Sequence, residues 1–132
     1  MFEYHGWVVI RESPREVDDG GLAAVVEDLG RFLCQPPWQS RGVTLANYNG
    51  LTQLTVGRLS NHSGSTHADL IALLERIGRD ASGSYGIVHF HDDEAEVFEQ
   101  RNEFRAIYLR RGVVKELVDL NLSPIVPTIE DP

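Results

Sequence analysis

The chain has 132 residues, of which 42% are hydrophobic and 24% charged. These values are ordinary for one globular domain and exclude disordered, collagen-like and coiled-coil proteins. Twenty acidic residues against twelve Lys and Arg give a net charge of −8, which argues against a nucleic-acid-binding protein, because binding phosphates requires a basic face.

The first predicted elements are a strand over 3–12 and a helix over 19–34. The run Trp7-Val8-Val9-Ile10 is apolar on both faces of a strand, so we expect a buried strand with Trp7 in the core. The helix is indicated by apolar residues that recur at helical spacing and by acidic residues suited to its first turn. The apolar positions are Leu22, Val25, Val26, Leu29 and Leu33, and the acids are Asp18 and Asp19.

A β-hairpin is predicted over 43–58. Asn49-Gly50 can adopt the positive φ angles that a type I′ turn requires. A two-residue turn then pairs Tyr48 with Leu51, Leu45 with Leu54 and Val43 with Val56, and the last two pairs share one apolar face.

Helical spacing predicts a second helix over 66–80, with Thr66 and Asp69 resembling a capping box. A strand follows over 84–92, and a second hairpin joins 104–110 to 113–118 about Arg111-Gly112. The buried stripe expected on the second helix consists of Leu70, Leu73, Leu74 and Ile77.

The resulting order is β-α-β-β-α-β-β-β. This order favours an α+β fold with a mainly antiparallel sheet of about six strands and two helices packed on one face. We expect one domain over 1–122, followed by an extended, proline-containing tail over 123–132.

The expected compartment is the cytoplasm. The single cysteine, Cys34, cannot form an intramolecular disulfide, and we expect it to be packed or partly buried. The first residues lack an apolar run of signal-peptide length, and no stretch reaches the roughly 18 apolar residues of a membrane-spanning helix.

No constellation of catalytic residues is recognisable, so we predict neither enzymatic activity nor a cofactor. His89 and His91 lie two apart on a predicted strand and therefore share a face, beside Asp92 and Asp93. A metal- or ligand-binding domain or small enzyme that uses these histidines is the alternative hypothesis. It needs a third convergent ligand, so two histidines on a solvated or partner-facing strand are the favoured interpretation.

The segment 92–103 contains six acids and one arginine, and so carries a charge of −5 out of the total of −8. Such a run is typically a solvated loop, but it can also guide and dock a cationic partner. Phe98 lies within this run, and an aromatic residue surrounded by carboxylates is the usual composition of an interface hot spot with a polar rim. Trp38 follows two prolines and is either a lid over the core or a partner contact. The candidate partner-binding residues are Asp92, Asp93, Glu94, Glu96, Phe98, Glu99, Glu103 and Trp38.

Several short motifs occur along the chain in a fixed order. They are Phe2-Glu3-Tyr4-His5-Gly6-Trp7, Ser82-Gly83-Ser84-Tyr85-Gly86, Asp92-Asp93-Glu94, Leu109-Arg110-Arg111-Gly112, and Asp119 with Leu122-Ser123-Pro124. From near residue 2 to about residue 127 the chain thereby resembles the immunity protein 7 family of bacterial polymorphic toxin systems.

The resemblance implies a small α+β protein that is made beside a secreted or contact-delivered toxin. Such a protein binds the C-terminal domain of its cognate toxin stoichiometrically and blocks it, and no catalytic residues carry over. Many such toxins are nucleases with basic clefts, which an acidic surface complements; a deaminase or an ADP-ribosylating toxin is equally compatible with the resemblance. The expected partner is therefore a toxin domain, with no role for nucleic acid or membrane.

Overall fold

The computed structural model describes residues 1–13 and 20–130. Within them the strands and long helices follow the predicted order, with two short helical turns added between them and a third after the last strand. The elements are β1 (Phe2–Ile10), α1 (Leu22–Leu33), η1 (Trp38–Ser40), β2 (Val43–Tyr48), β3 (Leu51–Ser60), α2 (Thr66–Asp80), β4 (Tyr85–Asp92), η2 (Phe98–Asn102), β5 (Phe104–Arg110), β6 (Val113–Val118) and α3 (Ile125–Thr128).

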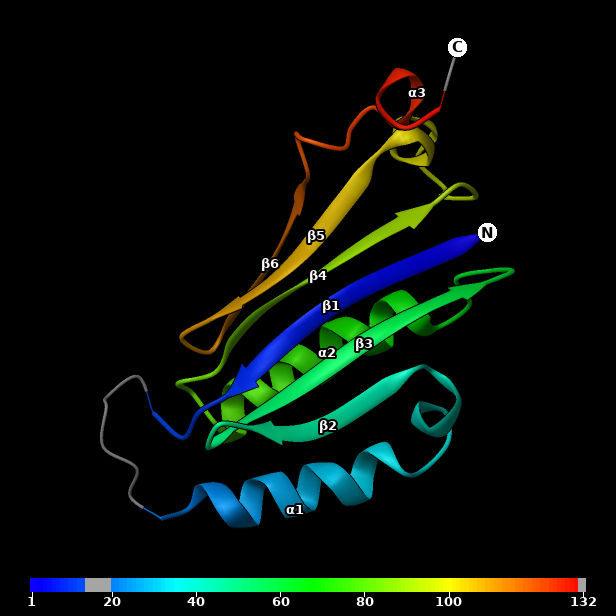
Figure 1. Ribbon diagram of the computed structural model, residues 1–132. Helices are drawn as coiled ribbons and strands as arrows, with labels where there is room; N and C mark the ends of the chain where they lie inside the picture. The colour runs from blue at the N-terminus through cyan, green and yellow to red at the C-terminus, as the bar shows by residue number, and fades with distance from the viewer. Residues whose placement is uncertain (14–19, 131–132) are drawn as a thin grey trace.

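The six strands form one open sheet in the order β2-β3-β1-β4-β5-β6, and every neighbouring pair is antiparallel. The predicted α+β class is confirmed. Elements β1 to β4 with their two helices follow the split β-α-β arrangement of ferredoxin-like proteins. The β5–β6 hairpin then extends the sheet beside β4 (Figure 1).

The register of the first hairpin is confirmed pair by pair: Val43 lies opposite Val56, Leu45 opposite Leu54 and Tyr48 opposite Leu51. Its two turn residues, Asn49 and Gly50, have φ angles of 53° and 86°. These positive values let a two-residue turn follow the natural twist of the strands. The second hairpin turns at Arg111-Gly112 in the same way, with φ angles of 50° and 74°.

The core lies between the sheet and the two long helices. Alternate residues of the four central strands point toward the helices, and Val8, Leu54, Val88 and Ile107 are fully buried there. The helices contribute the predicted stripes, of which Leu29, Leu33, Leu70, Leu73, Leu74 and Ile77 are buried. Since α1 and α2 pack on one face, the other face of the central strands carries their intervening side chains (Figure 1).

Two local predictions about the helices are wrong. The capping box at Thr66 does not form: Ser65 is the N-cap, Thr66 is already helical and buried, and the Asp69 carboxylate pairs with Arg41 at 2.7 Å. Cys34 is exposed, because it follows the last residue of α1 and lies outside its buried stripe. Asp18 and Asp19, the expected first-turn acids of α1, lie outside the described residues.

The C-terminal residues are not simply extended. The Ser123 hydroxyl accepts a hydrogen bond from the N–H of Phe104 at 2.8 Å, and Asn102 accepts one from the N–H of Val126 at 3.0 Å. Ile125, in the short turn α3, is only 6% exposed. These contacts dock the segment against the start of β5. In the part of the chain that the structure describes, no helix has the length and apolarity needed to cross a membrane.

Candidate functional site

The acidic segment, residues 92–103, connects β4 to β5 at one end of the sheet (Figure 1). The Asp92 carboxylate accepts a hydrogen bond from the N–H of Glu94 at 3.0 Å, and the Arg101 side chain donates to the carbonyl of Ala95 at 2.7 Å. These bonds fold the segment into a compact loop that includes η2. The six acidic residues of the segment therefore lie on one short folded loop.

Phe98 is the most exposed aromatic side chain in the described residues, at 74%. Its ring lies under the guanidinium of Arg101, 5.5 Å from the ring centre, and the neighbouring Val97 is 49% exposed. Phe98 and Val97 therefore do not pack into the hydrophobic core, and their apolar surface is exposed to water. Burial against a partner would remove this apolar surface from water.

Two of the acidic side chains hold the segment to neighbouring parts of the chain. Asp93 pairs with the amino group of Met1, and this contact raises the pKa of that group above its ordinary value. Glu94 pairs with His62 at 2.7 Å. These carboxylates therefore position the loop in the unbound protein.

Of the other glutamates in the segment, one is paired within the chain and two are available to a partner. Glu103 pairs with Arg105 at 3.0 Å at the foot of the loop. Glu96 and Glu99 are exposed and form no ion pair with any residue in 1–13 or 20–130. A cationic partner could therefore bind them without first breaking an existing pair.

A hollow of about 340 Å³ lies beside the acidic segment, next to the first turn of α2. Four of its lining residues are acidic, namely Asp92, Glu96, Glu103 and Glu116. Part of this charge is already balanced, because Glu116 pairs with Arg105 at 3.1 Å and with His67. A second hollow, of about 630 Å³, lies between Phe98 and the docked C-terminal residues.

The structure separates the two alternatives for Trp38 and corrects the position expected for Trp7. Trp38 is 4% exposed and packs against Phe32, with ring centres 6.4 Å apart, so it is the lid over the core and its side chain is not available to a partner. Trp7, expected in the core, is 41% exposed. The prediction for Trp7 is wrong because β1 has only one face against the helices, and Trp7 points to the other.

His89 and His91 share a face of β4, as predicted. His91 donates to the carbonyl of Arg101 at 2.8 Å, and His89 lies 3.6 Å from the Asp119 carboxylate. In residues 1–13 and 20–130 no three His, Cys, Asp or Glu side chains are grouped so as to hold a metal ion. The observed contacts of these histidines are with their own chain.

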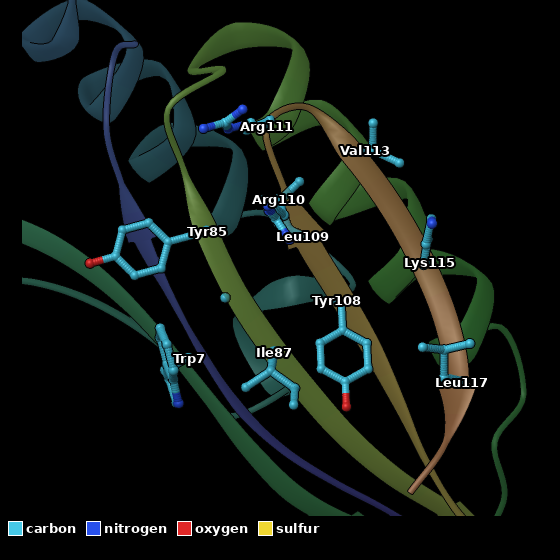
Figure 2. A pocket seen from close by; sticks show the side chains of 11 residues that line it. Trp7, Tyr85, Ile87, Tyr108, Leu109, Arg110, Arg111, Val113, Lys115 and Leu117 are labelled. Carbon is cyan, nitrogen blue, oxygen red and sulfur yellow. The ribbon is translucent and has the colours of Figure 1, made fainter. Parts of the chain in front are cut away.

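A feature that the sequence did not reveal is a hollow of about 670 Å³ on the sheet face opposite the helices, which we call the open-face hollow (Figure 2). Trp7, Tyr85 and Tyr108 line it, on three adjacent strands. The available signal was that the run Trp7-Val8-Val9-Ile10 is apolar on both faces of its strand, whereas two helices cover only one face of the sheet.

The fold and these surfaces define a small α+β protein whose most exposed features, the acidic segment and the open-face hollow, are suited to binding another protein. A family model described as Immunity protein 7 matches residues 1–131, essentially the whole chain. The chain therefore belongs to this family and is an immunity protein of toxin systems. Comparisons with curated proteins and with solved structures found no match.

Proposed function

We propose that this protein neutralises one cognate toxin domain by binding it stoichiometrically, transforms no substrate, and docks through the acidic segment. The observation that carries the proposal is the exposed Phe98 within a run of carboxylates, on a loop that the chain's own contacts keep folded. An aromatic anchor surrounded by a polar rim is the usual composition of a binding hot spot.

Charge supports the same assignment. The acidic segment carries −5 of the chain's −8 and would speed the encounter with a basic surface. The adjacent hollow has a volume of about 340 Å³, which can hold a long basic side chain, and Asp92 and Glu96 in its lining could neutralise the charge. Enzymes that act on nucleic acids need such basic side chains to hold phosphates. We therefore propose a nuclease as the toxin, with the acidic segment covering or flanking its cleft.

The test is binding and protection with the toxin domain encoded beside this protein. Isothermal titration should give one toxin domain per chain. The double variant Glu96→Lys/Glu99→Lys should weaken the complex by about tenfold or more, because it places like charges against the basic cleft. Cells that carry this variant should lose protection when the toxin is expressed.

A matched control is the pair Glu27→Lys/Glu75→Lys, which makes the same change in net charge on the exposed sides of α1 and α2. It should leave affinity nearly unchanged. Equal loss in both pairs would reduce the effect to net charge and remove the acidic segment as the docking site. Protection by far less than one chain per toxin, or turnover of a substrate by the purified chain, would contradict stoichiometric inhibition.

A further inference from the structure

The open-face hollow is built by strand register. Trp7, Ile87, Tyr108 and Lys115 lie directly opposite one another on β1, β4, β5 and β6. The next row in the same direction brings Tyr85, Arg110 and Val113 together. Residues two apart on a strand share a face, so both rows point away from the helices. Figure 2 shows their side chains on one side of the four strands.

The apolar part of the hollow is unusually aromatic for a surface. Trp7, Tyr85 and Tyr108 are 41%, 40% and 36% exposed, and the rings of Trp7 and Tyr85 meet edge to face with centres 6.1 Å apart. Val113 and Leu117 on β6 are each 54% exposed at the far side. A contiguous exposed apolar surface of this kind is typical of an interaction site.

The charged part of the hollow is entirely basic. Arg110, Arg111 and Lys115 line it, and no Asp or Glu is among its lining residues. In the described part of the chain these three cations form no ion pair, whereas Arg31, Arg41, Arg76, Arg79 and Arg105 all pair with carboxylates. Arg58 and Arg101, elsewhere on the described surface, also form no ion pair, but their side chains donate to backbone carbonyls. Three unpaired cations beside exposed aromatic rings favour an occupant that is both anionic and apolar.

We propose that the open-face hollow is a second docking surface, which binds a segment of the toxin that carries carboxylates next to an aromatic or aliphatic side chain. This inference rests on the proposed function for the identity of the partner. A protein segment fits better than a small ligand because the hollow is open and is lined by Trp, Tyr and Arg, the residue types that dominate protein–protein hot spots. The toxin segment that binds the open-face hollow is therefore acidic, whereas the toxin surface that binds the acidic segment is basic.

The two surfaces can be altered separately. The hollow lies where β4 begins and β5 ends, whereas the acidic segment lies where β4 ends and β5 begins. Along β5, the four residues 104–107 lie between Glu103 of the acidic segment and Tyr108 of the hollow, a distance of roughly 16 Å in an extended strand. A substitution in one therefore leaves the side chains of the other in place.

The main experiment measures affinity of the full chain for the same toxin domain. Arg110→Glu/Lys115→Glu should weaken the complex by about tenfold or more, because carboxylates of the toxin would then face carboxylates. The matched control Arg31→Glu/Arg79→Glu makes the same charge change on exposed helix positions and should alter affinity less than about threefold. An unchanged or tighter complex with the hollow variant would overturn the proposal.

Trp7 provides a second readout. Trp38 is buried, so quenching of tryptophan fluorescence by acrylamide reports mainly on Trp7. Bound toxin should protect the fluorescence from quenching, and the Trp7→Phe variant should lose that protection. Quenching that stays unchanged in the complex would show that the hollow remains open, which refutes the proposal.

The outcomes also separate this inference from the proposed function. If Glu96→Lys/Glu99→Lys weakens binding and the hollow variant does not, the inference fails and the proposed function stands. If no complex with the toxin forms, the proposed function fails, and a blocked peptide of alternating Glu and Phe then tests the hollow by itself. It should protect Trp7, and a matching Lys and Phe peptide should not. Protection by neither peptide, by single-stranded RNA alone, or by self-association of the chain would overturn the inference.

Discussion

The acidic segment and the open-face hollow are built in opposite ways. The acidic segment takes its charge from consecutive residues, 92–103, and its shape from a few loop hydrogen bonds. The hollow takes one residue from β1 and three from each of β4, β5 and β6, and the sheet beneath it is packed against α2. The first surface therefore depends on local sequence, whereas the second depends on the whole fold.

This difference should appear most strongly in stability. Leu109 lies on β5 beneath the hollow, faces the helices and is 1% exposed. Leu109→Ala should lower the free energy of unfolding by about 2–5 kcal/mol, because it leaves a cavity in the core. Phe98→Ala, in the acidic segment, should change it by less than about 0.5 kcal/mol. Urea denaturation followed by circular dichroism measures both, and equal losses would contradict the distinction.

The same Phe98→Ala variant should have its effect on binding. Removing an exposed anchor from a hot spot typically costs about 2 kcal/mol, roughly 30-fold in affinity for the toxin. Tyr48→Ala is the matched control, since Tyr48 is an aromatic residue of β2 that is 56% exposed, outside both surfaces. Titration calorimetry with the toxin domain decides the matter. A toxin that binds Phe98→Ala as tightly as the native chain would show that the acidic segment attracts the partner without anchoring it.

Support of the hollow by α2 can be tested at a single glycine. A Cβ at Gly78 would lie 2.9 Å from the Leu109 side chain and 3.1 Å from the Cα of Gly112 in the β5–β6 turn. Gly78→Ala should therefore destabilise the protein by about 1–3 kcal/mol through overpacking.

Gly30, on α1, is the natural control for Gly78. A Cβ there would meet only the Leu45 side chain, at 4.0 Å. Gly30→Ala should stabilise the protein by up to about 1 kcal/mol, because alanine favours the helix more than glycine does. The two thermal unfolding midpoints should therefore move in opposite directions. An upward shift of the midpoint in Gly78→Ala as well would mean that α2 does not approach the hollow as closely as described.

Most of the fold could be predicted because its signals are local. Asn49-Gly50 defines a two-residue turn, and the pairing of six residues in the first hairpin then follows. The apolar spacing of α2 predicts both its length and its buried face. The Thr66 cap failed because Asp69 binds Arg41, a residue 28 positions away that local reasoning does not see.

Of the two candidate surfaces, only the acidic segment could be predicted, because its residues are consecutive in the sequence. Six acids within 92–103 are visible in the sequence, and so is Phe98 among them. The hollow was missed because it is assembled by the register of four strands. Two helices cover only one face of the sheet, and Trp7 points to the other. The sequence left Trp38 open between a lid and a partner contact for a related reason: its loop is polar in sequence, but η1 turns the ring onto Phe32.

The smallest expected effect is a dependence of stability on pH, which comes from Tyr4. It sets the pH range in which binding by the two surfaces can be compared. Burial raises the pKa of the Tyr4 hydroxyl, which donates a hydrogen bond to the carbonyl of Arg41 at 2.9 Å. The folded chain therefore keeps this proton at pH values where the unfolded chain releases it. The contribution of Tyr4 to stability is constant below about pH 10 and falls as the pH rises further.

Tyr4→Phe should consequently flatten the loss of stability above about pH 10, although it costs the hydrogen bond to Arg41 at neutral pH. Unfolding free energies measured between pH 7 and about pH 11 test this sign, and an unchanged slope in Tyr4→Phe would contradict it. Below pH 10 this part of the scaffold is constant, so salt and charge-reversal effects on binding can be assigned to the two surfaces rather than to the titration of Tyr4.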